Sequence, residues 1–377
     1  MNPRSVGVEE ELLLVEPETG RPQAVADTVL RAAELAAESL DDASQDAEAE
    51  LELELQQQQL ETNSRPCRSL ADLHEELRRC RAAAAAAAER AGAQVAALAT
   101  SPLQVQPEVV DTQRYQRMSD AYGLTAHEQL TCGCHVHVEI TSADEGVAVL
   151  DRIGPWLSTL LALSANSPFW QGHDSCYASY RYQAWGRWPS SGPTEPFGTA
   201  ERYRETLRQM VDTGALLDTG MVYFDARLSE HYPTLEIRIA DVCLRAEDAV
   251  LIAALARALV ETEARAARDG QPARSVRTEL LRLAGWRASR SGLDDVLLSP
   301  VTGRPEQAAT VVHALVSHCQ DALADTGDAD TVAELLTALL ARGTGTAFQR
   351  DAYRRYGRLA DMISRAVTVT AGSQPPG

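Results

Sequence analysis

The sequence predicts an α+β fold built on an antiparallel sheet that carries acidic and histidine side chains on one face. Several segments alternate apolar and polar residues with the period of two that strands show. Long segments with helical periodicity lie between these strands and follow the last of them. Helices segregated from strands in this way are typical of α+β proteins, in which helices cover one side of an antiparallel sheet.

Length and charge limit the domain organisation and the classes of partner that this protein can have. The chain has 377 residues, of which 45% are hydrophobic, enough for one large core. We expect a single domain over residues 1–370, largely helical from about 245 to 370, and a disordered tail over 371–377. The formal net charge of −19 argues against nucleic acid or an anionic membrane as a partner.

The chain contains no lysine, so all 35 of its lysine-plus-arginine residues are arginines. This excludes a P-loop lysine, a Schiff-base lysine and the strand lysine of protein kinases. If the protein handles a nucleotide, metal ions and arginines must neutralise the phosphates.

The cysteine pattern predicts a reducing compartment. Seven cysteines are scattered, their number is odd, and no apolar signal segment opens the chain. We therefore expect free thiols and a cytoplasmic protein, and we find no apolar run long enough to cross a bilayer. Cys132 and Cys134 lie beside His135 and His137, but a zinc site would require a second cysteine pair and a longer spacer.

The first predicted strand covers residues 7–15 and contains two carboxylates on one face. Apolar residues of even number alternate with Glu9 and Glu11. Two neighbouring carboxylates repel each other, and a divalent metal ion between them is the simplest remedy. The alternative is a solvated strand face, on which alternating charge is ordinary.

A second acidic segment covers residues 49–64, between a helix predicted over 24–40 and a long helix that begins after Ser69. Glu54 and Glu61 have opposite parity, so one regular strand cannot point both at the same site. A bulge, or a turn between two strands, would bring them together. Otherwise both are surface charges. Ser69 and Asp72 form a capping-box-like start to the long helix, which precedes a buried strand over 95–98.

The next key strand covers residues 131–140. Here His135, His137 and Glu139 share one face, which favours ligand or phosphate-binding roles over purely structural ones. An apolar helix over 144–166 follows. Residues 171–197 are rich in glycine, serine, tyrosine, tryptophan and arginine without helical periodicity, which indicates a long binding loop or an aromatic cap on the core.

The last strands are predicted over 221–225 and 234–241. Glu236 and Arg238 share a face of the latter, where they could serve the site or form an exposed ion pair with each other. After residue 245 the pattern is helical, with helices over 245–268, 276–288, 307–325, 331–341 and 347–369 and a turn over 344–346. Several carboxylates with few histidines suit Mg²⁺ or Mn²⁺ better than zinc.

With these motifs in order, the sequence resembles the glutamate–cysteine ligase 2 (YbdK-type) carboxylate–amine ligases. The resemblance spans nearly the whole chain and rests on residues 7–11, 132–138, 165–172, 177–181, 185–189 and 235–238. Cys176 stands where the family generally has glycine. The resemblance implies a catalytic domain like that of glutamine synthetase and the guanido kinases, and ATP-dependent joining of a carboxylate to an amine.

The resemblance also implies roles for particular residues. The implied metal ligands for Mg²⁺ or Mn²⁺ are Glu9, Glu11, Glu54, Glu61, His135 and Glu236. The implied catalytic residues are Arg181, Arg238 and Glu61, and those that bind ATP are Arg187, Arg238 and His137. The implied substrate-binding residues are Tyr177, Tyr180, Arg181 and Trp185.

The implied chemistry is attack of a substrate carboxylate on the γ-phosphorus of ATP, followed by attack of an amine on the acyl phosphate. The substrates would be a small carboxylate and a small amine, with a γ-glutamyl-cysteine type of product as one option. Two alternatives remain, a guanido-kinase-like phosphotransferase and a non-catalytic nucleotide-binding relative. The family also suggests a homodimer.

Overall fold

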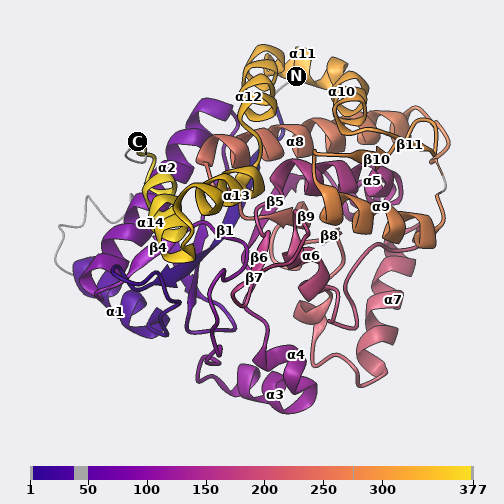
Figure 1. Cartoon of the computed structure of the whole chain (residues 1–377). Coiled ribbons are helices and arrows are strands. Elements are labelled where there is room, and N and C mark those ends of the chain that lie inside the picture. The colour runs from indigo at the N-terminus through magenta and orange to yellow at the C-terminus, as the bar shows by residue number, and fades with distance from the viewer. Residues whose placement is uncertain (1–2, 38–49, 275, 375–377) are drawn as a thin grey trace.

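The computed structural model describes residues 3–37, 50–274 and 276–374, and its centre is an antiparallel sheet (Figure 1). The strand order is β2-β3-β1-β5-β9-β8, and β4 pairs with the end of β1. The strands of this sheet are β1 Val6–Val15, β2 Glu50–Leu53, β3 Gln59–Asn63, β4 Gln94–Ala96, β5 Gly133–Glu139, β8 Ala226–Leu228 and β9 Thr234–Asp241. The predicted α+β class with an antiparallel sheet is confirmed.

Three long helices cover one face of this sheet. They are α2 Leu70–Arg90, α5 Ala143–Ser164 and α8 Ala246–Arg268, and Figure 1 shows α5 and α8 above β5 and β9. Val8, Val136 and Ile237 point into this layer, where they join the side chains of the helices in one apolar cluster. Because successive strand residues alternate between faces, the odd-numbered residues of β1 point to the other side. Ser69 caps α2 as predicted, accepting a hydrogen bond from the Asp72 amide at 3.0 Å.

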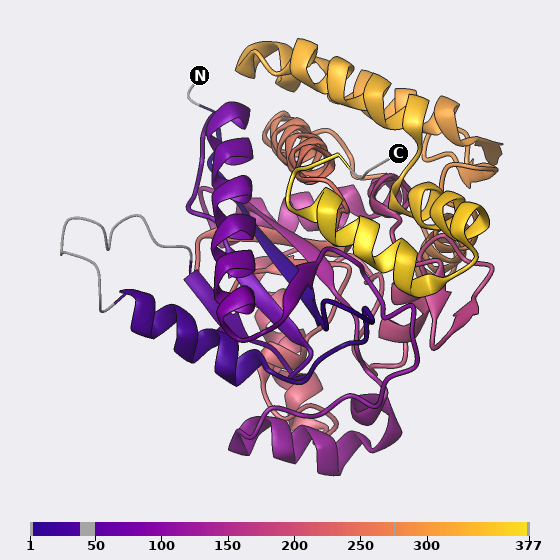
Figure 2. The ribbon, with the colours of Figure 1, turned by 60° about the vertical axis from the view of Figure 1, so that its left-hand side comes forward.

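The remaining elements surround this core. The shorter helices are α1 Ala26–Ala37, α3 Gln113–Tyr122, α4 Leu124–His127, α6 Tyr180–Trp185, α7 Ala200–Asp212, α9 Thr278–Ser291, α10 Ala308–His318, α11 Gln320–Thr326, α12 Ala329–Arg342, α13 Gly345–Tyr356 and α14 Leu359–Thr370. Two small hairpins pair β6 Phe169–Trp170 with β7 His173–Asp174, and β10 Val296–Leu298 with β11 Pro305–Gln307. Figure 2 shows α13 and α14 lying beside the strand layer.

Several predicted boundaries were wrong, each for a local reason. The strand expected over 221–225 is a 3₁₀ helix, η2 Thr219–Met221, followed by irregular chain, and the actual strand β8 comes directly afterwards. The helix expected over 347–369 is two helices, because Gly357 adopts a left-handed φ of 72° and ends α13. The turn expected over 344–346 is the start of α13.

Two further expectations need correction. The helix predicted over 307–325 divides at Cys319 into α10 and α11. The segment 171–197 is not loop alone, because Ser179 caps the short helix α6 within it. The ends of the helix predicted over 24–40 and of the tail predicted over 371–377 fall partly outside the described residues.

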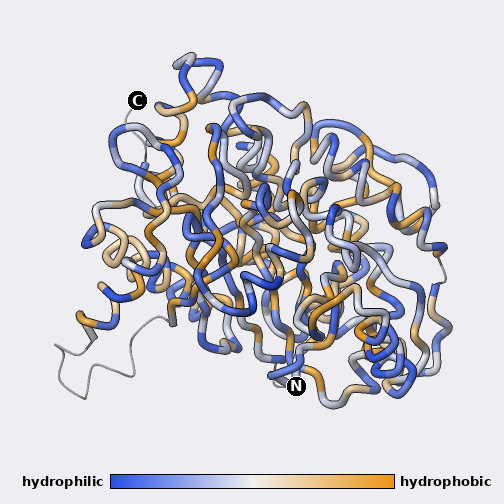
Figure 3. The backbone as a smooth tube through the Cα atoms, turned by 90° about the horizontal axis from the view of Figure 1, so that it is seen from below, coloured by the Kyte–Doolittle hydropathy of each residue, from blue (hydrophilic) through white to orange (hydrophobic). Residues whose placement is uncertain are grey.

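One helix, α5, is long and apolar enough to span a membrane, so the expectation that no such segment exists was wrong. Its apolar window is 72% buried inside the protein, where it packs between β9 and the helices α8 and α9. Figure 3 shows hydrophobic stretches running through the middle of the molecule. By this burial α5 is a core helix of the fold.

A buried ion pair fixes the central strand to the helical layer. Glu10 of β1 is fully buried, and Arg81 of α2 donates to its two carboxylate oxygens at 2.8 and 2.6 Å. The same guanidinium donates to the carbonyls of Cys243 and Leu244, which follow β9, at 2.6 and 3.0 Å. One side chain thus satisfies a buried charge and joins three elements of the fold.

We predict that Arg81→Met lowers the free energy of unfolding by about 3–5 kcal/mol, because it leaves the Glu10 carboxylate buried without a partner. Urea denaturation measures this change. The control Arg78→Met, at an exposed position of the same helix, should change it by less than about 0.5 kcal/mol. The double variant Glu10→Leu/Arg81→Met should recover most of the loss. Equal effects of Arg81→Met and Arg78→Met would contradict a stabilising role.

Candidate active site

The register of the sheet brings the predicted acidic and histidine residues together on the face that the long helices leave free. Glu9 of β1 lies opposite His135 of β5, and Glu11 lies opposite Glu61 of β3. On the other side of β5, His137 lies opposite Glu236 of β9. Directly opposed side chains of an antiparallel pair are close neighbours. Pairing alone therefore places six residues from four strands in one patch.

Glu54 enters this patch through a turn. Strand β2 ends at Leu53, and β3 begins at Gln59 and pairs back with β2. Of the two arrangements that the parity of Glu54 and Glu61 allowed, the turn between two strands is the one present. The Glu54 carboxylate accepts the Leu55 amide at 2.8 Å and belongs to a group of carboxylates with Glu11 and Glu61.

The donors form three overlapping groups that could each hold a metal ion. They are Glu9–Glu61–His135, Glu9–His137–Glu236 and Glu11–Glu54–Glu61, and within each group the ligand atoms lie within 4.8 Å of one another. All six predicted metal ligands belong to these groups, and His137, expected to contact ATP, joins them. No cysteine of the described chain takes part in such a group.

The donor set fits a hard divalent cation. Carboxylates dominate it, as Mg²⁺ and Mn²⁺ prefer. Glu11 and Glu61 are opposed like charges, which destabilise a strand pair unless a cation lies near them. The buried His135 Nε2 has no hydrogen-bond partner among the described residues, and its Nδ1 lies 3.1 Å from the Glu9 carboxylate. An unpartnered imidazole nitrogen beside carboxylates is available as a ligand.

The pKa values within the site are driven apart. Burial raises the pKa of Glu54 to about 7, with a further contribution from the Glu11 carboxylate. Burial and the carboxylates of Glu9, Glu54 and Glu11 hold the pKa of Glu61 well above its ordinary value. Burial would also raise the pKa of Glu9, but the imidazoles of His135 and His137 outweigh it and bring that pKa well below the ordinary range. Without metal, the site therefore holds protons on some carboxyls and charge on others.

Arg238 and Glu236 lie at the centre of this face, buried to 8% and 2% exposure. They form an ion pair with each other, and Arg227 of β8 donates to Glu236 at 2.6 Å. The alternative in which Glu236 and Arg238 form an exposed ion pair was therefore wrong, because the pair is buried. Burial opposes the charge of Glu236, but Arg238 and Arg227 bring the pKa of this carboxyl down to about 2.

Arg181 of α6 is buried behind the same face. Its guanidinium donates to the Ile239 and Arg238 carbonyls at 3.4 Å, and its Nε has no partner among the described residues. A Cβ on Gly133 would lie 2.2 Å from Arg181 Nη2 and 3.0 Å from His135 Nε2. Glycine at this position therefore leaves room for both side chains.

A cavity of about 200 Å³ opens over these groups. It is lined by Glu9, Glu11, Glu54, Leu55, Gln59, Glu61, Arg114, Tyr115, Met118, Gln129, Thr131, His135, Trp185, Trp188, Gly220, Tyr223, Arg227 and Arg238.

The sequence did not predict Arg227 as a site residue, because the strand was expected over 221–225. With β8 placed correctly, its position opposite Glu236 would have revealed it. Arg114 lines the cavity as well, and its tertiary partner Asp218, at 3.0 Å, has no local signal in the sequence.

Six predicted residues are not among those that line this cavity. Three of them, His137, Arg181 and Glu236, contact Glu9 or Arg238 of the acidic face. The other three have separate partners. Arg187 is held by an ion pair with Glu128 at 2.6 Å. The Tyr180 ring packs against Trp170, with ring centroids 5.4 Å apart, and the Tyr177 hydroxyl accepts from the Trp286 indole at 3.3 Å.

Cys176, in the same segment, has a left-handed φ of 61°. This is the backbone conformation that favours glycine, the residue the family generally has there.

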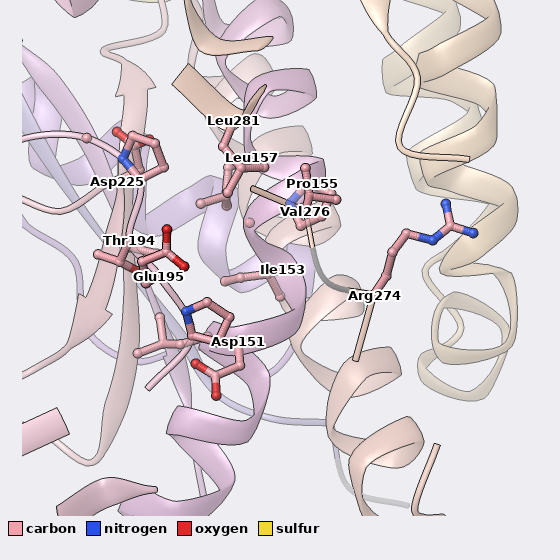
Figure 4. A pocket seen from close by; sticks show the side chains of 16 residues that line it. Asp151, Ile153, Pro155, Leu157, Thr194, Glu195, Asp225, Arg274, Val276 and Leu281 are labelled. Atoms are coloured by element: carbon pink, nitrogen blue, oxygen red, sulfur yellow. The ribbon is translucent and has the colours of Figure 1, made fainter. Parts of the chain in front are cut away.

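A second cavity, shown in Figure 4, has a structural character. Its volume is about 40 Å³, and Asp151 and Glu195 are among the side chains that line it. Asp151 accepts the amides of Phe197 and Gly198 at 2.7 Å. None of the potential metal groups of the described chain lies there. We therefore place the candidate active site at the larger, acidic cavity.

Comparison with known proteins identifies the family. A family model described as glutamate–cysteine ligase family 2 matches residues 5–368. A Streptomyces avermitilis protein provisionally named glutamate–cysteine ligase 2-1 is 54% identical over 98% of this chain and 100% of its own length. A Streptomyces coelicolor protein provisionally named glutamate–cysteine ligase 2 is 52% identical over 97% of this chain and 99% of its own.

Solved structures share the fold at low sequence identity. The glutamate–cysteine ligase of Francisella tularensis, in complex with AMP, has a TM-score of 0.66 at 13% identity, covering 100% of this chain and 91% of that one. A bifunctional glutathione synthetase from Pasteurella multocida has a TM-score of 0.67 at 15% identity. It matches 98% of this chain, which spans about half (52%) of that longer protein.

The family match over nearly the whole chain agrees with the motifs, the antiparallel sheet and the acidic face that this sheet presents. We conclude that this chain belongs to glutamate–cysteine ligase family 2 and is an ATP-dependent carboxylate–amine ligase.

Proposed function

We propose that the protein joins the γ-carboxylate of a glutamate-type substrate to the amine of a cysteine-type substrate, using ATP with Mg²⁺ or Mn²⁺. The observation that carries this proposal is one acidic face at which three overlapping donor groups, two of them with a histidine, lie beside the arginines Arg227 and Arg238. The provisional names of the relatives support the choice of substrates.

The proposed metal ligands are the members of the three groups, with Glu9 and Glu61 each shared by two of them. The ions they would hold supply charge neutralisation for the phosphates of ATP. Arg238 and Arg227 point at the same face, where each could take a phosphate oxygen in exchange for its contact with Glu236. Among the residues that the structure describes, the other basic side chains of the cavity lining are Arg114 and His135, whose pKa burial lowers to about 4.

The proposed reaction has two steps. A carboxylate oxygen of the first substrate attacks the γ-phosphorus, the bond to the bridging oxygen breaks, and ADP leaves. The amine nitrogen of the second substrate then attacks the acyl carbon, and phosphate leaves with the electrons of the C–O bond. A carboxylate such as Glu61, or the departing phosphate, takes the proton that the amine loses. The chain supplies orientation and fixed charges, and it needs no covalent intermediate of its own.

Trp185 would contact substrate, since it lines the cavity beside Tyr223, with ring centroids 4.8 Å apart. Arg181 would act through its position beside Gly133 and Glu11. The roles predicted for Arg187, Tyr177 and Tyr180 would require ligand atoms that extend beyond the cavity.

Further proposals concern the whole protein. The seven cysteines are free, which supports a reducing cytoplasm as its location. Residues on both sides of position 245 share the two main apolar clusters, which supports one domain over 1–370. A homodimer rests on the family resemblance alone, and sizing chromatography with light scattering tests it.

The first prediction concerns product identity. With Mg²⁺, ATP, glutamate and cysteine, the protein should release phosphate only when both amino acids are present, and Glu9→Gln should abolish release because Glu9 serves two donor groups. Coupled phosphate assay and mass spectrometry of the product measure this. The control Glu16→Gln, an exposed position just after β1, should keep full activity.

Other outcomes would redirect the assignment. A product that keeps the phosphoryl group would indicate the guanido-kinase-like alternative. Release that needs a carboxylate and an amine other than glutamate and cysteine would keep the ligase and overturn the substrates. ATP binding without turnover for any screened pair would indicate the non-catalytic alternative.

The second prediction concerns pH. The folded-state pKa of Glu54 is about 7, above the unfolded value of about 4.3, so the metal-free protein should lose stability as pH rises through this interval. Metal ligation requires deprotonated carboxylates. The rise in Tm on adding Mg²⁺ should therefore be larger at pH 8 than at pH 6, and Glu54→Gln should reduce this difference. An equal rise at both pH values, measured by scanning calorimetry, would contradict proton-linked metal binding.

The third prediction concerns Gly133→Ala. The added methyl would displace Arg181 and His135, and we expect kcat to fall at least about tenfold, which corresponds to a barrier increase of about 1.4 kcal/mol. Circular dichroism should show an intact fold. The control Gly154→Ala, in α5, adds a methyl that lies 3.4 Å from Leu281 of α9 and should leave kcat unchanged. Wild-type kcat in Gly133→Ala would show that the positions of Arg181 and His135 are not critical.

A further inference from the structure

A further polar cavity, separate from the two described above, lies among the C-terminal helices. Its volume is about 310 Å³. Its lining comprises Leu244, Arg245, Asp248, Arg342, Gly343, Thr344, Gly345, Phe348, Asp351, Ala352, Arg355, Tyr356 and Arg365. It shares no lining residue with the cavity of the proposed ligase site. Four arginines against two aspartates make it positive within a chain of net charge −19.

The arginines of this cavity are not all used inside the protein. Arg342 forms an ion pair with the buried Asp248. Arg245 and Arg355 form no ion pair with any part of the chain that the structure describes. The other lining aspartate, Asp351, pairs instead with Arg354, which lies outside the lining. Two guanidinium groups therefore remain available to an anion.

The backbone adds to this positive character. The segment Arg342-Gly343-Thr344-Gly345-Thr346 is a glycine-containing turn that leads directly into α13. The helix has no side-chain cap at Thr344 and no acidic residue in its first turn. Such a loop at a helix N-terminus presents amides and a positive dipole end to an anion.

A second helix begins at the same cavity. The 23-residue α8 starts after Arg245, which makes no side-chain cap either. Its first turn contains Glu247 and Asp248, so carboxylates of the chain already compensate the positive end of this helix. The N-terminus of α13 and the two arginines without an ion pair are therefore the features that favour an anion.

Both glycines of the turn are required by packing. Gly343 has a φ of 81°, and a Cβ there would lie 2.5 Å from that of Ala347. A Cβ on Gly345 would collide with the Asn166 side chain. The loop is therefore held close to its neighbours in one conformation.

Tyr356 holds two of the arginines in place. Its ring lies beneath two guanidinium groups, with Arg365 at 3.9 Å and Arg355 at 5.3 Å from the ring centroid. These cation–π contacts orient both side chains at the cavity.

We propose that this cavity, which we call the arginine pocket, binds a phosphate-type dianion, either as free inorganic phosphate or as the phosphoryl group of a larger ligand. The dianion would accept hydrogen bonds from Arg245, Arg355 and the turn that opens α13. The inference does not depend on the proposed substrates, since the arginine pocket lies outside the acidic cavity.

The test is calorimetric titration of the full chain with inorganic phosphate, without ATP or Mg²⁺, at an ionic strength held constant with chloride. The double variant Arg245→Gln/Arg355→Gln should bind at least about tenfold more weakly than the wild type. The control Arg204→Gln/Arg208→Gln removes the same charge from exposed positions of α7 and should bind as the wild type does. Thermal melts in chloride check that the variants fold.

The outcomes separate the possibilities. Unchanged phosphate binding in the arginine-pocket variant would overturn the proposal, because phosphate would then bind only in the acidic cavity or elsewhere. Equal weakening in both double variants would also overturn it, as a general effect of charge. A parallel titration with glycerol 3-phosphate assigns the source, since tighter binding than inorganic phosphate indicates a larger phosphorylated ligand and weaker binding indicates the free ion. Ligase activity should persist in the arginine-pocket variant, so failure of one proposal does not imply failure of the other.

Discussion

Repulsion among carboxylates is the constraint on which the site depends. Strand pairing sets Glu11 against Glu61, and the β2–β3 turn adds Glu54 to them. In isolation this arrangement costs free energy, because burial first and the neighbouring carboxylates second raise the pKa values of Glu54 and Glu61. It is tolerable when cations or protons lie between the carboxylates. A ligase that handles ATP needs a site where charge can be neutralised in this way, so the local cost and the proposed chemistry have the same origin.

The opposite face of β1 fixes this strand to the helical layer. Glu10 points away from the acidic cavity and is fixed by Arg81, which also reaches the carbonyls of Cys243 and Leu244. Neighbouring glutamates of β1 therefore have opposite tasks, since those of odd number face the cavity and the even one holds the strand against α2.

Sequence patterns located most of the site because its residues lie on strands. Period-two alternation places Glu9 with Glu11, and His135 with His137, on one face without any knowledge of the partners. Motif order supplied the family and the reaction class. Arg227 and the environments of Arg181 and Tyr180 were not foreseen, because each depends on contacts between distant segments. The misplaced strand at 221–225 shows how an error of a few residues hides a functional side chain.

The sequence by itself determined the α+β class, the faces of the strands, the free-thiol chemistry and the family, since these follow from periodicity, composition and local motifs. Only the tertiary structure decided which strands are neighbours, that a turn rather than a bulge brings Glu54 to Glu61, and that Glu236 and Arg238 are buried. It also decided that arginines from four separate helical segments meet in the arginine pocket. Register, burial and the convergence of distant helices arise from packing across the whole chain, which local sequence patterns do not encode.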